Sequence, residues 1–238
     1  MRRRSHLLIV AGMTTDTVQL DPVADSPTWT RVFAAIYEPT LWIGERAGMC
    51  RHRRELLTQA RGRTVEIGSG TGLNLVHYPD DLSELVLAEP EPSMRKRLER
   101  AVRRRERPAR VIGARAEQLP FPDASVDTVV STLVLCTVDA PDLALREIAR
   151  VLRPDGQLLF IEHVRSDSAA LARWQDRLVR AWKRFAEGCR CNRATLELMN
   201  ACGFQLEARP AAWRAMPPII RPLAIGRATI LAPRGQEA

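Results

Sequence analysis

The sequence of 238 residues contains almost no lysine, although its formal net charge is +8. Its lysines are Lys96 and Lys183, and arginines spread along the whole chain supply the rest of the Lys/Arg charge. A surface that binds single-stranded nucleic acid combines a basic groove with aromatic side chains on which bases stack. The densest basic run, residues 95–110, contains no aromatic residue. We interpret it as a solvated helix face and expect no specific nucleic-acid partner.

The five cysteines lack the spacing of a structural framework. They are odd in number, and no two are separated by the Cys-x-x-Cys interval that many zinc sites and redox pairs use. The sequence therefore predicts neither a disulfide network nor a metal site. Few disulfides are typical of reducing compartments, so the composition favours a cytoplasmic location. The cysteines are Cys50, Cys136, Cys189, Cys191 and Cys202.

Long apolar runs are also missing. No stretch approaches the ~20 apolar residues that cross a bilayer as a helix, so no transmembrane segment is predicted. The basic and apolar residues 2–10 mimic a signal peptide, but the apolar part is short and no small-residue cleavage site of the usual kind follows. Residues 1–27 are polar and contain Asp-Pro and Ser-Pro breakers, so we expect a flexible arm. The sequence gives no indication of the oligomeric state.

A glycine-rich segment follows a β-branched run at residues 65–72. Two nucleotide-binding patterns are absent from it, because Leu73 stands where the dinucleotide fingerprint has glycine and no Gly-Lys-Ser/Thr follows. The pattern that is present predicts a strand, a tight turn, a helix and a second strand ending in Glu89. Such a unit binds nucleosides, because Gly68, Gly70 and Gly72 let a ligand approach the backbone and a carboxylate can hold ribose hydroxyls.

Hydrophobic periodicity predicts seven strands, with helices between most of them. Short apolar runs that alternate with helical segments are typical of a doubly wound α/β fold with a mostly parallel sheet. Residues 28–60 show a helical pattern, and Pro154-Asp155-Gly156 is expected to form a turn before the fifth strand. The predicted strands span residues 63–67, 85–89, 109–112, 126–131, 157–162, 204–208 and 226–231.

Two further stretches accompany the Glu-x-Gly-x-Gly-x-Gly segment. Residues 113–127 contain Glu-Gln-Leu-Pro-Phe-Pro-Asp, and residues 147–158 contain Val-Leu-Arg-Pro-Asp-Gly. The three stretches, in this order, resemble the motifs of class I S-adenosylmethionine (SAM) methyltransferases of small molecules. The resemblance implies a Rossmann-like fold, with SAM as cofactor and S-adenosyl-L-homocysteine as product. It also implies one domain over residues 28–238, divided into cap helices (28–60), a cofactor-binding core (61–165), a substrate-side helical insertion (166–203) and C-terminal strands (204–238).

The resemblance assigns cofactor contacts beyond the glycines and Glu89. Glu66 would organise the glycine loop, Ala116 and Glu117 would lie along the adenine edge, and Ser131 would face the methionine part of SAM. Arg115 departs from the pattern, because many relatives have an aspartate there that accepts a hydrogen bond from the adenine amino group. Arginine cannot accept a hydrogen bond, so that contact must move or be lost.

The acceptor side is less sharply defined. Glu162 and His163 end the fifth predicted strand, at the edge where doubly wound sheets bind ligands. A histidine there can take up a proton near neutral pH, so both are candidate catalytic residues, with a histidine bonded to a neighbouring loop as the alternative. Tyr37, Cys136 and Trp174 are candidate substrate-binding residues, although a cysteine at an apolar strand end often belongs to the core.

An apolar stripe at helical spacing runs from Leu171 to Phe185 and includes two tryptophans. It predicts packing against the sheet, a lid, or a face that touches lipid, so peripheral membrane contact is an open alternative. With residues 133–136, residues 162–164 and Gly188-Cys189, the stripe resembles the thiol S-methyltransferase group, which is related to phospholipid N- and quinone C-methyltransferases. The resemblance implies a small-molecule acceptor, with a thiol preferred and a phospholipid headgroup or quinone as alternatives. An RNA methyltransferase is a distant alternative, whose Asn-Pro-Pro-Tyr type of motif is absent after residue 130.

Overall fold

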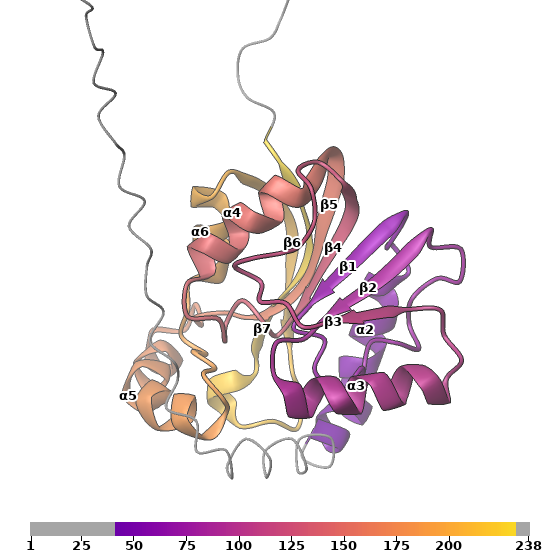
Figure 1. Ribbon diagram of the computed structural model, residues 1–238. Helices are drawn as coiled ribbons and strands as arrows, with labels where there is room; N and C mark the ends of the chain where they lie inside the picture. Colours follow the sequence, from indigo (N-terminus) through magenta and orange to yellow (C-terminus); the bar gives the residue numbers. More distant parts are fainter. Residues whose placement is uncertain (1–40, 232–238) are drawn as a thin grey trace, which may run out of the picture.

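The computed structural model describes residues 41–231, which form one seven-stranded sheet with helices around it (Figure 1). The predicted doubly wound α/β architecture is confirmed. The strands are β1 (Arg63–Ile67), β2 (Glu84–Ala88), β3 (Arg110–Ile112), β4 (Val126–Thr132), β5 (Leu152–His163), β6 (Phe204–Ala212) and β7 (Pro222–Ile230). The helices are η1 (Glu45–Met49), α2 (Cys50–Leu57), α3 (Pro92–Arg104), α4 (Pro141–Val151), α5 (Ala169–Phe185), α6 (Thr195–Ala201) and η2 (Pro218–Ile220).

The winding of the chain reverses between the neighbouring strands β1 and β4. Across the sheet the order is β3-β2-β1-β4-β5-β7-β6, in which the first five strands are parallel and β7 runs antiparallel to both of its neighbours. The chain winds outward from β1 to β3 and then returns to β4 beside β1, with Ile67 opposite Ser131. Doubly wound sheets bind ligands at the carboxyl ends of strands at such a reversal.

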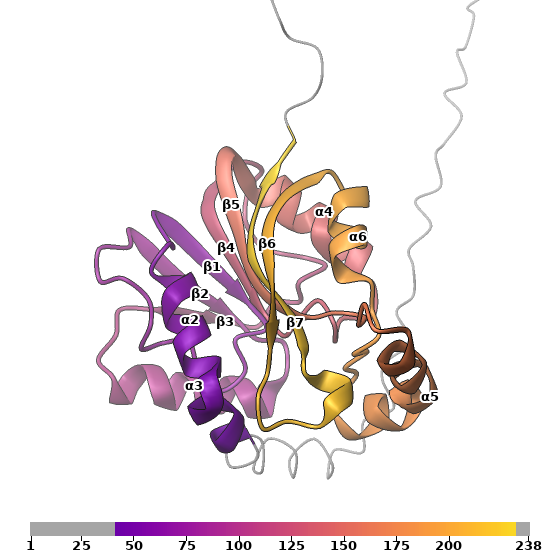
Figure 2. The same ribbon diagram turned by 180° about the vertical axis from the view of Figure 1, so that it is seen from behind.

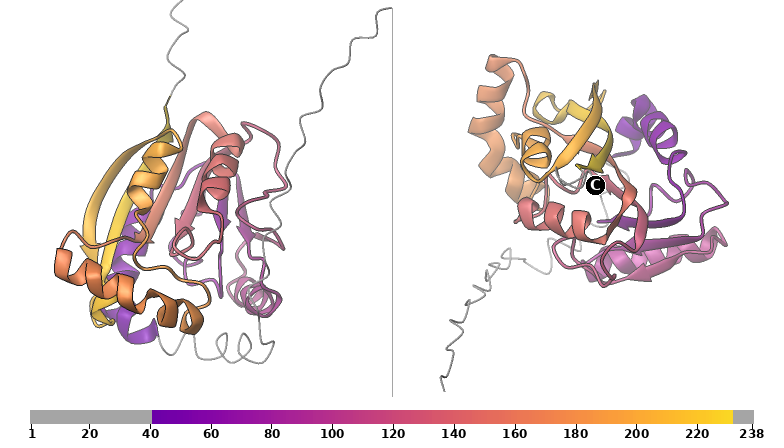
Figure 3. Two further views of the ribbon diagram at one scale, coloured as in Figure 1. Left: turned by 90° about the vertical axis from the view of Figure 1, so that its left-hand side faces the viewer. Right: turned by 90° about the horizontal axis from the view of Figure 1, so that it is seen from above.

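Alternating side chains of the strands build two apolar layers, because successive residues point to opposite faces. On β5, Leu158 and Phe160 belong to one apolar cluster, whereas Leu159 and Ile161 belong to the other. The cluster of Leu159 contains α2 and α3, and the cluster of Phe160 contains α4 and α6. Figure 2 shows α2 in front of the sheet, and Figure 3 shows α2 and α4 on opposite sides of it.

Two local predictions were wrong. The segment after the glycine turn forms successive turns rather than a helix, with His77 N–H donating to Asn74 O at 2.9 Å. It is held by side-chain hydrogen bonds described below. Residues 154–156 form no separate turn but lie within β5, whose pairing with β4 jumps from Leu152 to Gln157 and leaves these residues in a bulge. Tyr37 and the predicted arm at 1–27 lie outside the described residues.

The predicted apolar stripe forms α5, but it is not buried as a unit. Trp174 is 55% exposed, and Leu178 and Phe185 are also exposed. The inward face instead carries Ala172 and Gln175. The fully buried Gln175 amide donates to the carbonyls of Cys191 and Ile219, at 2.8 and 3.0 Å, and so fastens α5 to the chain around η2. Within residues 41–231, every helix is too short or too polar to span a bilayer.

Candidate cofactor and acceptor site

The glycine loop after β1 has the backbone that its sequence predicts. Gly68, Gly70 and Gly72 have φ values of +55°, +56° and +90°, which side-chain-bearing residues rarely adopt. A Cβ atom at Gly68 would lie 2.6 Å from Val134 Cγ2, and one at Gly72 would lie 2.8 Å from Leu75 Cδ1. At Gly70 a Cβ would meet no atom within 4 Å. Packing therefore requires the outer glycines, whereas the middle glycine borders open space where a ligand can approach.

Glu89 closes the glycine loop from the tip of β2. Its Oε2 accepts a hydrogen bond of 2.8 Å from Gly70 N–H, and its Oε1 accepts one of 2.9 Å from Glu91 N–H. Burial raises the pKa of this carboxyl group, and the two backbone donors partly oppose that shift. Each carboxylate oxygen has a further lone pair, so Glu89 can shape the loop and still accept from two ribose hydroxyls.

Glu66 organises the loop from beneath. It is 3% exposed and accepts hydrogen bonds from Tyr78 Oη at 2.7 Å and from Asn74 Nδ2 at 2.9 Å. Burial raises its pKa to about 7, against the opposing effect of these two donors and of Arg53. These contacts explain why the chain after Gly72 turns back toward β1 instead of continuing as a helix.

A buried hydrogen-bond network joins this loop to α2, and the sequence did not reveal it. Arg53, 4% exposed, donates to Asn74 Oδ1 at 2.8 Å and pairs with Glu45 at 3.0 Å. Asn74 also donates to Thr132 Oγ1 at the end of β4, at 3.1 Å. A polar Asn74 between the apolar residues 73 and 75 was the one available signal, but its partners lie on three separate elements.

The predicted adenine edge contains an acceptor without a partner. Ala116 is buried, and the buried Glu117 Oε1 has no hydrogen-bond partner among the residues that the structure describes. Its Oε2 lies 3.6 Å from Arg115 Nε. An unsatisfied buried carboxylate oxygen is unfavourable unless a donor arrives, and the adenine amino group is such a donor. Glu117 thus offers the acceptor that Arg115 cannot provide.

Glu162 is committed to the loop after β4. One oxygen accepts from Ser131 Oγ at 2.6 Å and from the N–H groups of Val134 and Leu135 at 3.0 Å, and the other accepts from Cys136 N–H at 3.2 Å. Burial raises the pKa of Glu162, and these four donors oppose the shift. Three of these four hydrogen bonds fall on Oε1, so Glu162 is largely engaged in holding the loop. These contacts favour a positioning role for Glu162 over the predicted catalytic one. Ser131 likewise contacts Glu162 with its hydroxyl group.

His163 is buried beside the same edge. It is 4% exposed, its ring stacks on Trp213 with centroids 5.7 Å apart, and Nδ1 has no hydrogen-bond partner within residues 41–231. Burial lowers its pKa to about 4, although the backbone carbonyls of Pro222 and Ile220 oppose the shift. The imidazole is therefore neutral at physiological pH and carries an available lone pair.

The remaining acceptor-side candidates have different fates. Cys136 is fully buried, with its sulfur 3.8 Å from Cys189 Sγ, and both sulfurs lie near His163. The sequence predicted no metal site, whereas the structure gathers three potential ligands from three separate segments, which cysteine spacing along the chain cannot show. Trp174 lies on the exposed side of α5 and is not among this group.

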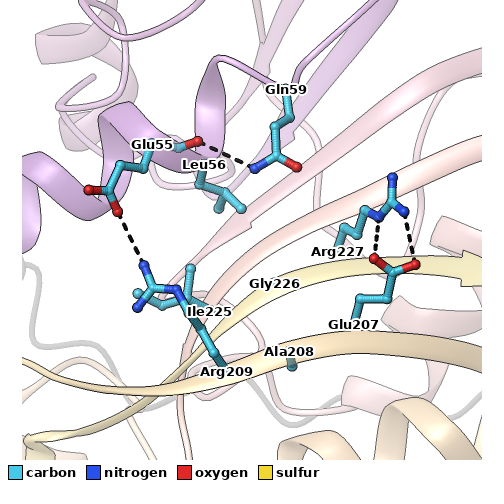
Figure 4. Close-up of a pocket in the computed structure, with 9 residues that line it drawn as sticks. All are labelled: Glu55, Leu56, Gln59, Glu207, Ala208, Arg209, Ile225, Gly226 and Arg227. Atoms are coloured by element: carbon cyan, nitrogen blue, oxygen red, sulfur yellow. Dashed lines mark hydrogen bonds and ion pairs between the residues drawn. The ribbon is translucent and has the colours of Figure 1, made fainter.

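A separate hollow of about 580 Å³ lies between α2 and the paired strands β6 and β7 (Figure 4). Its charged side chains are already paired, Glu55 with Arg209 at 3.2 Å and Glu207 with Arg227 at 2.8 Å. It contains neither the glycine loop nor Glu89, so we do not assign the cofactor to it. The lining residues are Glu55, Leu56, Gln59, Glu207, Ala208, Arg209, Ile225, Gly226 and Arg227.

Comparisons with known proteins agree with this geometry. Residues 65–160 match a family model described as a methyltransferase domain. Human thiol S-methyltransferase TMT1B is 35% identical over 191 residues, which are 74% of this chain and 77% of the relative. Phosphatidylethanolamine N-methyltransferase of Cereibacter sphaeroides is 33% identical over 138 residues, 55% of this chain and 65% of the relative. A SAM-dependent methyltransferase structure from Thermotoga maritima has the same fold, with a TM-score of 0.61 at 23% identity, covering 85% of this chain and 98% of that one.

The residues present fit SAM. Gly70 borders open space, Glu89 has lone pairs for ribose hydroxyls, and Glu117 carries an unsatisfied buried acceptor at the adenine edge. Gly70 follows β1, Glu89 follows β2 and Glu117 follows β3, so these features lie after the carboxyl ends of neighbouring parallel strands, beside the reversal of the strand order. Together with the similarity over most of the chain, they show that the protein belongs to the SAM-dependent methyltransferases and uses SAM as its methyl donor.

Proposed function

We propose that the protein methylates the sulfur atom of a small thiol. The observation that carries this proposal is the 35% identity with human thiol S-methyltransferase TMT1B, which extends over 74% of this chain and therefore well beyond the family-model match at 65–160. The segments that resembled thiol S-methyltransferases in the sequence, those of Cys136, His163 and Cys189, come together in the structure. Their convergence at one edge of the sheet supports an acceptor site there.

The cofactor side follows from the contacts described above. Gly70 would admit the cofactor to the loop, Glu89 would accept from the ribose hydroxyls, and Glu117 would accept from the adenine amino group, with Ala116 beside it. Bound there, SAM supplies an electrophilic methyl group on its sulfonium sulfur. Glu66 and Glu162 act behind this surface, because they shape the loops after β1 and β4.

The acceptor side would work by positioning and by exclusion of water. Val134 lies against Gly68, so the loop after β4 connects the cofactor loop with Cys136 two residues later. Cys136 and His163 are almost fully buried, and Trp213 covers the imidazole. Holding a nucleophile in line in a dry site supplies much of the acceleration of a displacement reaction. We propose that His163 and Cys136 line this site and that residues 166–203 cover its substrate side.

Methylation of a phospholipid amine is the second candidate. It is favoured by the similarity to phosphatidylethanolamine N-methyltransferase and by exposed apolar side chains before η1 and on α5, including Trp42, Ile43 and Trp174. Quinone C-methylation is a further alternative. RNA methylation is disfavoured because many arginines form ion pairs within the protein, such as Arg150 with Glu147 and Arg165 with Asp176.

A reducing, cytoplasmic location fits this proposal. All five cysteines are free, and a thiol acceptor is stable as a thiol where disulfides are kept reduced. Fractionation of cells that express the full chain would test the location.

A substrate panel tests the proposal. The protein is incubated with SAM that carries a deuterated methyl group and with equal amounts of candidate acceptors, and mass spectrometry identifies the labelled products. The acceptors are an alkyl thiol, an aryl thiol, a primary amine, a phenol, a quinol and phosphatidylethanolamine vesicles. We expect label on thiols. The matched control is Gly70→Val, whose side chain enters the open space of the loop and should abolish labelling. Labelling of the lipid amine without any thiol product would replace the thiol by the phospholipid.

A further inference from the structure

Three metal-ligating side chains meet at the carboxyl edge of β4 and β5. Cys136 lies in the loop after β4, His163 ends β5, and Cys189 follows α5. Each offers one ligand atom, and these atoms all lie within 4.8 Å of one another. The residues are 0%, 4% and 7% exposed, so the cluster is shielded from solvent. Among residues 41–231, no other group of three potential metal ligands comes this close together.

The spacing of the two sulfur atoms matches a tetrahedral metal centre. Cys136 Sγ and Cys189 Sγ are 3.8 Å apart. Two zinc–sulfur bonds of about 2.3 Å at the tetrahedral angle place the sulfurs roughly 3.8 Å apart. The ligand nitrogen of His163 lies within 4.8 Å of both sulfurs, so the imidazole must move toward them to complete a three-ligand set. The donor atoms, two sulfurs and one imidazole nitrogen, are those that Zn²⁺ prefers.

A second observation points to a ligand independently. His163 Nδ1 is buried and has no hydrogen-bond partner within residues 41–231, although its ring is fixed against Trp213. The neighbouring carboxylate of Glu162 does not bind the His163 ring. It accepts hydrogen bonds from Ser131 and from the loop N–H groups instead. Buried polar atoms are normally satisfied, so a buried unpaired ring nitrogen is a candidate ligand atom for an ion.

The backbone holds the two cysteines in place before any ion arrives. Cys136 N–H donates to Glu162 Oε2 at 3.2 Å, and Cys136 O accepts from Arg190 N–H at 2.8 Å, which ties the loop after β4 to the residue after Cys189. Gly188 has φ of +95°, and a Cβ there would lie 3.1 Å from Thr137 O. The glycine therefore permits the close approach of the two segments.

We propose that Cys136, His163 and Cys189 bind one soft divalent cation, with Zn²⁺ the best match, and that its fourth position holds the acceptor as a thiolate. Three protein ligands and one open position are the arrangement of catalytic zinc sites. Two thiolates balance the charge of the ion in a buried place. An acceptor thiol that coordinates there loses its proton to solvent and becomes a stronger nucleophile. The acceptor part of this inference rests on the proposed thiol methylation, whereas the metal site stands on the cluster itself.

Metal content is the first test. Protein purified in reductant without chelator is analysed by elemental mass spectrometry, and we expect about one zinc per chain. Stripped protein titrated with Co²⁺ should develop sulfur-to-cobalt charge-transfer bands. Cys136→Ser and Cys189→Ser should weaken Co²⁺ binding by at least ~100-fold, whereas the matched control Cys202→Ser should keep it. Because the wild-type spectrum needs no variant, misfolding of a variant cannot hide the result.

A disulfide between the same cysteines is the competing outcome. Intact mass spectrometry of protein purified without reductant would show a loss of two hydrogens, and reduction would restore them. Reduced wild-type protein that then binds neither Zn²⁺ nor Co²⁺ would overturn the metal site and leave a redox pair in its place. Reduced protein that takes up the metal supports the site, whatever its oxidised form does.

A thiol titration separates the metal site from the proposed function. Adding 2-mercaptoethanol to the cobalt form should shift its visible spectrum, and ethylene glycol, which has hydroxyls only, should not. Bound cobalt with no response to any thiol of the panel would overturn the acceptor role. A thiol-dependent shift without labelled thiol product from the zinc form would instead contradict thiol methylation and leave the site intact. Full thiol methylation by metal-free protein would also overturn the acceptor role.

Discussion

Ser131 Oγ donates a hydrogen bond of 2.6 Å to Glu162 Oε1 and so joins the ends of the neighbouring strands β4 and β5. The same carboxylate accepts from three successive N–H groups of the loop after β4. That loop begins at Leu133, whose φ of +61° is uncommon for a residue with a side chain. A single buried carboxylate therefore holds the backbone turn that brings Val134 to the glycine loop and Cys136 to the acceptor side.

Replacement of Glu162 should reveal this role in stability. Glu162→Gln leaves several buried N–H donors facing a neutral amide, and we expect the free energy of unfolding to fall by about 3 kcal/mol or more. Ser131→Ala removes one donor and should cost about 1–2 kcal/mol. Urea unfolding measures both, with the exposed Ser83→Ala as control. Unchanged stability in Glu162→Gln would mean that the carboxylate is free for chemistry.

Substitutions at two glycines of the loop should affect different properties, the affinity for SAM at Gly70 and the stability of the fold at Gly72. In Gly70→Ala the new Cβ meets no protein atom within 4 Å, so only the φ of +56° opposes it, at about 1–2 kcal/mol. Its affinity for SAM should fall at least ~10-fold, because the methyl group enters the ligand's space. Gly72→Ala is the matched control, since its Cβ would lie within 3 Å of both Leu75 and Leu98 and should mainly lower stability. Calorimetry measures the affinity for SAM, and unfolding curves measure stability. If both variants lose the same affinity and the same stability, this placement of SAM is contradicted.

Glu117 predicts a specific loss at the adenine amino group. Glu117→Ala should weaken S-adenosyl-L-homocysteine binding by about 1–3 kcal/mol, because a buried acceptor is removed. The same variant should bind S-inosyl-L-homocysteine, which lacks the amino group, about as well as the wild type does. A calorimetric double-mutant cycle measures the coupling directly. If both ligands lose affinity equally, Glu117 supports the loop without contacting the amino group.

Glu66 predicts a pH dependence of stability. Its pKa is raised from 4.5 to about 7 in the folded protein, chiefly by burial. Between these values the folded state keeps a proton that the unfolded state has released, so the free energy of unfolding falls as the pH rises from 4.5 to 7. Glu66→Gln does not titrate at this position. Relative to that variant, the free energy of unfolding of the wild type should fall by about 3 kcal/mol across this window. If the free energy of unfolding has the same pH dependence in both proteins from pH 4.5 to 7, the raised pKa of Glu66 is refuted.

The elements with strong local signals could be predicted from the sequence. The strand at 63–67 is β1, and the glycines follow it with the positive φ values of a tight turn, which is the feature that their spacing predicted. Periodicity could not show that Trp174 would face outward while Gln175 is buried, because Gln175 owes its burial to carbonyls of distant segments. The grouping of Cys136 with Cys189 also escaped prediction, since it depends on how α5 returns to the sheet edge.

The hydrogen bonds from Arg53 through Asn74 to Glu66 have one more consequence. Because they connect the two segments, local unfolding of α2 and local unfolding of the glycine loop are coupled. Coupling of this kind is reciprocal, so a ligand that tightens the loop also slows the fraying of the helix. Amide hydrogens of Cys50–Leu57 would then exchange more slowly in the presence of cofactor. Exchange along the helix would thus report occupancy of the glycine loop, which the helix reaches through Arg53 and Asn74.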